Sequence, residues 1–338
     1  MLSKNQKFKW SWLFYLAVLI LAFIFPALNP GSYYIQVVSL AFIYAIAVYG
    51  LNLIEGYMGQ LSLAQAGLFG FGAYAAALLT MKLQLSFWLA VPLASVLTAV
   101  VAFFIGLISF RTRGHYFVIF TLCIGVIINL VIQKWDAVTG GMNGLIGIPK
   151  PTPLGPISFD SLKAQYYLIL VFLLLTVFVM YRLVNSLIGR TFVSIRNSEE
   201  LAAALGINVM KNKILAFCVA AFFTGMAGSL YAAFIRFIGP DISSPTLTFE
   251  FLLYLLAGGQ ASIAGPIVGT LLMSGLTESL QFLRDYRLLL FGPLLILIVK
   301  FLPMGIVGLI HKLASRSPFR RSAAKSLNPS KTVKGEGL

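Results

Sequence analysis

The sequence predicts an all-α membrane protein, a polytopic transmembrane helical bundle of about ten spans with re-entrant or broken helices. Of its 338 residues 59% are hydrophobic and only 10% are charged, and the mean hydropathy is +0.92. Soluble domains carry about 25% charged residues. The apolar residues form continuous runs, many near the ~20 residues that a helix needs to cross hydrocarbon. They lack the alternation of polar and apolar residues that a membrane β-barrel requires.

Polar or glycine-rich breaks separate the apolar spans. The first span follows the lysines of the N-terminus and has no small-residue cleavage site before Pro26, so we expect a retained helix and not a removed signal peptide. The eighth is too short to cross a bilayer. We place the spans at residues 10–28, 34–54, 62–81, 87–110, 115–133, 164–181, 214–235, 247–257, 263–280 and 288–302.

Charge orients these spans within a transmembrane domain over residues 1–310. With a cytosolic N-terminus, 18 of the 25 Lys and Arg residues lie inside and 7 lie outside. The positive-inside rule therefore places both termini and a loop at about 189–213 in the cytosol, and a loop at about 134–163 outside. Residues 311–338 form a basic tail with few large apolar residues, which we expect to be disordered and cytosolic.

Several function classes are disfavoured. The net charge of +15 does not indicate a nucleic-acid partner, because the basic residues flank spans that require a lipid bilayer. The phosphate-binding pattern GxxxxGK[ST] is absent, and His115 and His311 have no ligand at metal spacing. Cys123 and Cys218 lie within apolar spans as packed free thiols. We expect no catalytic residue, no cofactor and no metal, and hence a protein that is not an enzyme.

The loop at about 189–213 is the longest polar interval between apolar spans, and its centre has the pattern of one short helix. Asn197 or Ser198 can cap the start, where Glu199 and Glu200 place negative charge at the positive end of the helix dipole. Gly206 can end the helix in a left-handed conformation. About two turns are not stable alone in water. The helix therefore rests either on the protein's own membrane domain or in a groove on a partner.

This loop resembles the cytoplasmic coupling loop of ATP-binding-cassette (ABC) importer permeases, whose motif is Glu-Ala-Ala, three residues and Gly. Glu200, Ala202 and Gly206 match, whereas Leu201 replaces the first Ala. The text IRNSEE at 195–200 and ALGIN at 204–208 resembles the branched-chain amino acid (Liv-type, LivM-like) permease family, and the resemblance runs from about residue 45 to residue 308. It implies ATPase-coupling roles for Arg196, Glu199, Glu200, Ala202, Ala203 and Gly206.

Two glycine-rich breaks share the pattern Gly-Gln-x-Ser-x-Ala, at Gly59 to Ala64 and at Gly259 to Ala264. Broken helices commonly form transporter sites, and small residues also permit close helix packing; both interpretations stay open. Our span count puts both copies on one side of the membrane, so we treat the match as coincidence and not as an inverted repeat. The candidate translocation-pathway residues are Gly59, Gln60, Ser62, Gln65, Gly259, Gln260 and Ser262.

The outer loop contains TGGMNGL at 139–145, followed by four prolines. Proline excludes regular helix or central strand there. The glycine-rich part resembles the same permease family, which implies a surface for a substrate-binding protein at Gly140, Gly141, Asn143 and Gly144. A turn-rich connector or lid is the alternative.

The resemblance implies a permease subunit of an ABC importer in the bacterial cytoplasmic (inner) membrane. Such a subunit moves branched-chain or related amino acids by alternating access. Its implied partners are cytosolic ABC ATPase subunits, a second permease subunit and an extracytoplasmic substrate-binding protein. Alternatives are a urea or short-amide ABC permease, and a secondary transporter driven by an ion gradient. The latter would need a buried carboxylate or histidine relay, whereas Glu55, Glu250 and Glu278 lie near predicted span ends.

Overall fold

A computed structural model describes residues 22–28, 31–112, 114–155, 158–279, 300 and 305–308. Nearly all regular structure in these ranges is helical, and one two-stranded antiparallel sheet accompanies it. In chain order the elements are η1 (Phe25–Leu28), α2 (Ser32–Leu51), η2 (Asn52–Tyr57), α3 (Gln65–Met81), α4 (Phe87–Ser109), α5 (His115–Lys134), α6 (Asp136–Thr139), η3 (Gly141–Asn143), β1 (Leu145–Ile146), α7 (Leu162–Val184), α8 (Leu187–Asn197), α9 (Glu199–Ala204), α10 (Val209–Ile235), β2 (Phe237–Ile238), η4 (Pro240–Ser243), α11 (Pro245–Gly258) and α12 (Gly265–Ser279).

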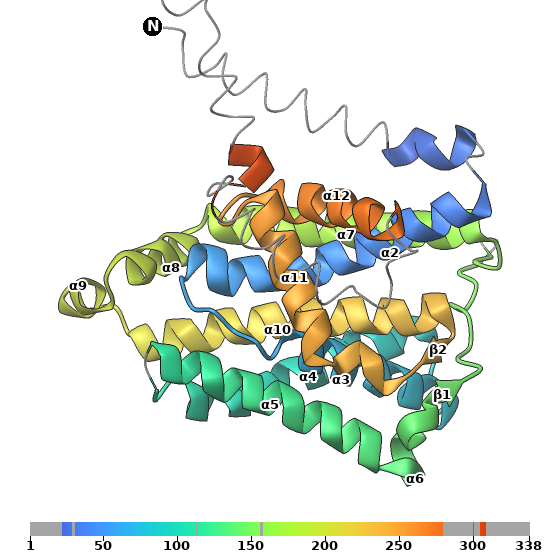
Figure 1. The fold of residues 1–338 in the computed structure, drawn as a ribbon, viewed down its shortest axis with the longest axis horizontal. Helices are drawn as coiled ribbons and strands as arrows, with labels where there is room; N and C mark the ends of the chain where they lie inside the picture. Colours follow the sequence, from blue (N-terminus) through green and yellow to red (C-terminus); the bar gives the residue numbers. More distant parts are fainter. Residues whose placement is uncertain are drawn as a thin grey trace, which may run out of the picture.

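The long helices lie side by side along one axis (Figure 1). Helices α8 and α9 lie at one end of this bundle, and α6 with the β1–β2 pair lies at the other. We call these ends the α9 end and the β1 end.

Within the described ranges, five helices are long and apolar enough to cross a membrane: α2 with η2, α4, α5, α7 and α10. Three shorter apolar helices, α3, α11 and α12, accompany them. The predicted all-α membrane bundle is confirmed at this level, whereas the count of about ten spans is not. The first and tenth predicted spans fall largely outside the described residues, and the tail at 311–338 falls wholly outside them.

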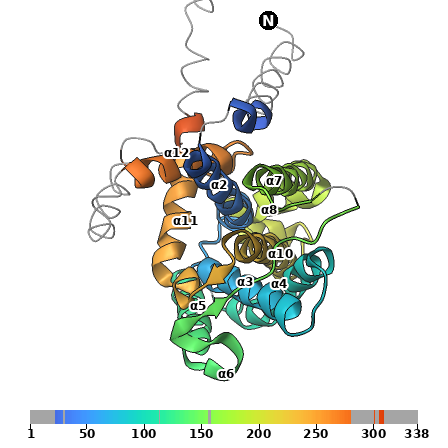
Figure 2. The same cartoon turned by 90° about the vertical axis from the view of Figure 1, so that its right-hand side faces the viewer.

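Burial separates an inner group of helices from an outer group. The apolar windows of α2 and α10 are 78% and 67% buried, against 33% or less for α4, α5 and α7. Figure 2 shows α10 between α2, α7, α4 and α3 when the bundle is viewed along its length. The outer helices therefore direct apolar side chains away from the protein, as a lipid-facing layer does.

Small residues bring α3 and α10 together. A Cβ atom added at Gly72 would collide with the backbone of Gly225, and one added at Gly228 would collide with the carbonyl oxygen of Phe69. Only a hydrogen fits at these positions, so the two backbones approach directly. Close helix packing, one of the two interpretations of the small residues, therefore occurs where α3 crosses α10.

The predicted second span changes its winding before it breaks. After Leu51, α2 widens into the π-helix η2, and the chain then runs without regular structure from residue 58 to residue 64. Helix α3 begins at Gln65, three residues later than the span predicted from Ser62. π-Helical turns recur at functional sites, and residues of this one take part in four of the hydrogen bonds described below.

Candidate functional site

The segment between α7 and α10 forms two helices instead of the single short one predicted. Helix α8 was missed, although Phe192 and Ile195 are buried at a helical spacing. Ser198 then has an extended backbone, and its side chain accepts a hydrogen bond from the Leu201 amide at 3.2 Å. Of the two predicted caps Ser198 is therefore the right one, and Asn197 is the last residue of α8. Gly206, with φ of +83°, follows α9 as predicted.

Helix α9 is tied to the break after α2 and to the start of α10. Gln60 Nε2 donates to Glu199 Oε1 at 3.0 Å, and Lys213 Nζ lies 2.5 Å from the same oxygen. At the adjoining end of α8, Arg196 Nη1 donates to the Gly56 carbonyl oxygen of η2 at 2.5 Å. Lys213 is only 4% exposed, so its ammonium depends on Glu199 for a counter-charge. We call this set of contacts the α9 junction.

The second glycine-rich break, between α11 and α12, contacts the same π-helix. Asn52 Oδ1 accepts from the Ala261 amide, and Asn52 Nδ2 donates to the Ser262 carbonyl oxygen, both at 2.9 Å. Gln260 Nε2 donates to Glu55 Oε1 at 2.7 Å. The two breaks therefore meet, through η2, beside the α9 junction.

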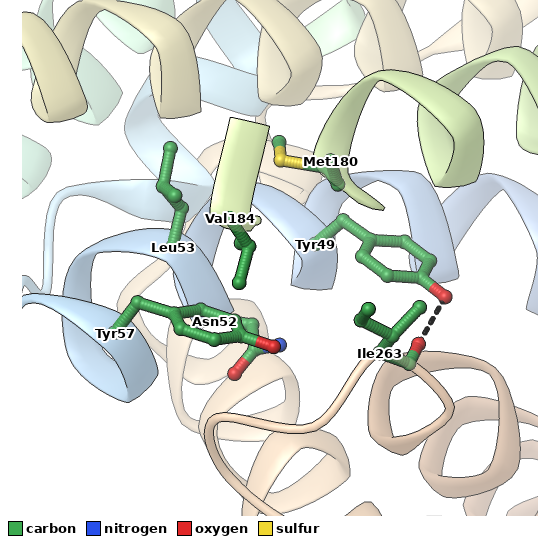
Figure 3. A pocket seen from close by; sticks show the side chains of 7 residues that line it. All are labelled: Tyr49, Asn52, Leu53, Tyr57, Met180, Val184 and Ile263. Carbon is green, nitrogen blue, oxygen red and sulfur yellow. Dashed lines mark hydrogen bonds between the residues drawn. The ribbon is translucent and has the colours of Figure 1, made fainter. Parts of the chain in front are cut away.

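A small cavity lies beside this meeting point (Figure 3). The Tyr49 hydroxyl closes one side of it by donating to the Ile263 carbonyl oxygen at 2.5 Å. Its volume is about 10 Å³, which is room for one water molecule at most. It is too small for an amino acid, so it marks a packing gap between α2, α7 and the second break. The seven lining residues are Tyr49, Asn52, Leu53, Tyr57, Met180, Val184 and Ile263.

Two of the predicted pathway residues lie elsewhere. Ser62 and Gln65 are fully buried, and their side chains have no hydrogen-bond partner among the described residues. Their neighbours bond to other helices: the Leu63 amide donates to Thr121 Oγ1 of α5 and the Ala66 amide donates to Thr248 Oγ1 of α11, both at 3.1 Å. The start of α3 therefore lies between α5 and α11, inside the bundle.

The remaining predicted pathway residues have local roles. Gly59, at φ +75°, packs against the Arg196 side chain. Ser262 Oγ donates to the Gly259 carbonyl oxygen at 2.8 Å and accepts from the Gly265 amide at 2.9 Å, which closes the loop before α12.

Side chains on α9 divide into inward and outward groups. Ala202 is 2% exposed and packs within the chain, whereas Glu200 and Ala203 are exposed. Leu201 and Leu205, which the sequence did not single out, are 63% and 73% exposed. Their spacing of four residues places both on one face of the helix. An apolar pair at that spacing in a polar loop was the signal that could have revealed them.

The predicted outer-loop residues lie at the β1 end. Gly140, Gly141 and Gly144 all have positive φ, so they make the tight turns that let β1 pair with β2. Asn143 ends the short helix η3 between those turns. The exposed apolar side chains there are instead Met142 and Ile146, each 71% exposed.

A bundle of apolar spanning helices, broken twice and carrying a short exposed helix at one end, defines the class of membrane transport permeases. No cluster of His, Cys, Asp and Glu suited to a metal ion occurs in the part of the chain that the structure describes. The family described as "Branched-chain amino acid transport system / permease component" matches residues 33–299.

Curated relatives have the same function in their names as this family. The high-affinity branched-chain amino acid transport system permease protein LivM of Salmonella typhimurium is 31% identical over 318 residues, covering 87% of this chain and 74% of that protein. LivM of Escherichia coli gives the same values. LivH of Escherichia coli is 26% identical over 294 residues, 80% of this chain and 93% of that protein. No solved structure matches the chain significantly. The chain belongs to this family and is a multi-pass permease subunit of an ABC importer.

Proposed function

We propose that this chain forms, with a second permease subunit, the membrane pathway of an ATP-driven importer for branched-chain amino acids. The names of the relatives support the substrate class. One structural observation supports a role in energy coupling. The Glu199 carboxylate of α9 accepts hydrogen bonds from both Gln60 of the first break and Lys213 of α10. A displacement of α9 therefore acts directly on the first break and on α10 through these two contacts.

The surface for a cytosolic ATPase subunit is the outward face of α9. Leu201 and Leu205 present an apolar pair that an ATPase groove would remove from water, in the helix-in-groove mode of recognition. Glu200 and Ala203 are exposed beside this pair. Ala202 is buried against the chain itself, so it supports the helix from behind and does not meet the partner.

The coupling runs from α9 and the adjoining end of α8 to both breaks. Arg196 bonds to the carbonyl oxygen of Gly56, and the π-helix that contains Gly56 also holds the second break through Asn52. A ligand or partner shifts a conformational equilibrium only through contacts that differ between the two states. In this proposal ATPase closure supplies such a difference at α9, and the α9 junction transmits it.

The remaining partner binds at the opposite end. With the α9 end in the cytosol, as the distribution of Lys and Arg favours, the β1 end faces outside. Met142, Ile146 and Phe237 are exposed there at 71%, 71% and 45%. These side chains are the surface that we assign to an extracytoplasmic substrate-binding protein, and the loop glycines shape the turns that display them.

Purification and reconstitution test the proposal. Affinity purification of the chain from its native membrane should retain ATPase subunits and a second permease subunit. The complex in proteoliposomes, with ATP inside and the binding protein outside, should accumulate radiolabelled leucine, isoleucine and valine. Uptake driven by an ion gradient without the ATPase would overturn the energy source. Uptake of urea without uptake of any of the three amino acids would overturn the substrate class.

A further inference from the structure

Gln65 presents an unsatisfied amide in the interior of the bundle. The residue is 0% exposed, and neither Oε1 nor Nε2 has a hydrogen-bond partner within the described ranges. Three residues earlier, the Ser62 hydroxyl is in the same situation. A buried donor or acceptor that is left without a partner destabilises the fold, because it has lost its hydrogen bonds to water. Three such atoms this close in sequence give the start of α3 the capacity to hydrogen-bond a polar partner.

The amide lies near the middle of the bundle. Leu63 and Gly67 flank it, and the Leu63 amide bonds to Thr121, the seventh residue of α5. A Cβ atom added at Gly67 would lie 3.0 Å from the Cα atom of Gly125, the eleventh of the 20 residues of α5. Helix α5 is long enough to cross a membrane. The N-terminus of α3 therefore lies near half the depth of a spanning helix.

A second helix start meets the first at this point. Helix α11 begins at Pro245, and Thr248 Oγ1 in its first turn accepts the hydrogen bond from the Ala66 amide at 3.1 Å. The N-terminus of a helix carries a partial positive charge and favours anions. In transporters, broken-helix N-termini near the membrane midplane bind anionic substrate groups. Two such termini beside one unpaired amide make this position suited to a carboxylate.

Aromatic side chains line the next turn toward the β1 end. Phe69 follows Gln65 by four residues and so lies on the same face of α3. Its ring centroid lies 5.6 Å from those of Phe251 and Tyr231 and 6.2 Å from that of Tyr44. This aromatic cluster joins α2, α3, α10 and α11, and it offers apolar surface one helical turn from the polar start of α3.

We propose that Gln65 and the first turns of α3 and α11 form the station at which the transported α-amino acid binds in passage. The helix N-termini and the Gln65 NH₂ group face its carboxylate, and the Gln65 carbonyl oxygen accepts from its ammonium group. One amide supplies both donor and acceptor, which suits a zwitterion. The aliphatic side chain contacts the aromatic cluster of Tyr44, Phe69, Tyr231 and Phe251. The inference rests on the proposed function and names the residues that bind its substrate.

Cysteine accessibility tests the position directly. The chain has two native cysteines, Cys123 and Cys218, which alanine can replace. In that background Gln65→Cys, within the complete reconstituted complex, should react with the small reagent methanethiosulfonate ethylammonium during turnover. Leucine-loaded binding protein should slow the reaction several-fold. The matched control is Thr176→Cys on α7, because Thr176 is also 0% exposed but bonds to the Phe172 carbonyl oxygen of its own helix. An unreactive Gln65→Cys in every nucleotide state would overturn the inference.

Transport of a substituted complex provides the second test. Gln65→Met keeps the side-chain length and removes the amide, so leucine uptake should fall at least tenfold. The unfolding temperature should not fall, because the amide makes no bond in the described structure. A purely structural amide predicts the reverse, a lower unfolding temperature with normal uptake, and that result would overturn the inference. Wild-type complex that fails to import leucine would instead overturn the proposed function, which keeps the two failures distinct.

Discussion

Lys213 Nζ and Glu199 Oε1 lie 2.5 Å apart, and this ion pair joins the first residue of α9 to the second turn of α10. Its two members are unequally buried, with side chains 5% and 35% exposed. The lysine ammonium is largely removed from water. It contacts one carboxylate and the ring of Phe110, whose centroid lies 5.9 Å from Nζ. The glutamate keeps contact with water and with Gln60. The pair is therefore asymmetric, and each partner should respond differently to loss of the other.

We expect Glu199→Gln to destabilise the permease more than Lys213→Met does. The first change leaves a buried ammonium without its carboxylate, at a cost of about 1–3 kcal/mol. The second leaves a carboxylate that water and Gln60 still solvate. Thermal unfolding in detergent measures both, with Lys211→Met as the exposed control, which should stay within about 0.5 kcal/mol. Equal effects for the two variants would show that the ion pair is not asymmetric.

Substitution of both exposed leucines on α9 should detach the ATPase. Leu201→Asp with Leu205→Asp places two charges in an apolar interface, so we expect at least a tenfold loss of co-purified ATPase at equal permease abundance. The fold should be unaffected, because both side chains are exposed. Leu187→Asp is the matched control, since Leu187 on α8 is 77% exposed. Unchanged ATPase retention in the double variant would remove α9 from the docking surface.

Gly206 isolates the effect of backbone conformation. A Cβ atom added there meets no atom within 4 Å, so a substitution has space but must adopt φ of +83°. We expect Gly206→Val to cost about 1–2 kcal/mol and to loosen α9, whereas Gly206→Asn should cost much less, because asparagine tolerates the left-handed region. Amide hydrogen exchange of α9 reports the difference. Equal exchange in the two variants would mean that the turn relaxes to another conformation.

Asn52 should be essential for joining the two breaks. Asn52→Leu removes both bonds to the loop before α12 and leaves the Ala261 amide without its acceptor, so we expect a loss of stability of about 2 kcal/mol or more. Transport should fall further than stability alone explains, because the second break loses its link to η2. Asn185→Leu is the control, since its side chain is exposed and bonds within its own helix. Normal transport by Asn52→Leu would show that the breaks act independently.

Orientation can be tested outside the α9 junction at Arg190, which is exposed, and at Lys150, whose side chain is 37% exposed. In a background without Cys123 and Cys218, Arg190→Cys on α8 should resist an impermeant thiol reagent in intact cells. Lys150→Cys near the β1 end should react. The reason is the sequence-based count of Lys and Arg, which puts 18 of 25 on the same side of the predicted spans as the loop at about 189–213, and the positive-inside rule assigns that side to the cytosol. Labelling at position 190 but not at position 150 would reverse the orientation.

Local features of this fold were predictable from the sequence because neighbouring residues determine them. The cap at Ser198, the glycine that follows α9 and the interruption after residue 57 depend on side chains within a few positions of each other. The hydrogen-bond partners of Asn52 lie about 210 residues away in the sequence. A local sequence pattern cannot predict a contact at that separation. Helix α8 was missed because its polar residues lowered the apolar signal, although its buried positions keep a helical spacing.

The repeated Gly-Gln-x-Ser-x-Ala pattern has a chemical counterpart in the fold. The amide of Gln60 donates to Glu199, and the amide of Gln260 donates to Glu55. Each glutamine thus bonds a glutamate on the adjacent segment, and both copies lie near η2. The repeated pattern can be recognised in the sequence. The glutamates to which the two glutamines hydrogen-bond cannot be predicted from it, because they come from other parts of the chain.

The length of α10 connects the α9 junction to the opposite part of the bundle. Its 27 residues make a rod of about 40 Å at 1.5 Å per residue. Near its start, Lys213 forms the ion pair with Glu199. In its second half, Gly225 and Gly228 pack against the backbone of α3. A tilt of about 5° at the held end would move the far end of such a rod by about 3.5 Å. A small change of angle at the α9 junction would therefore displace the far end of α10 by more than the length of a hydrogen bond.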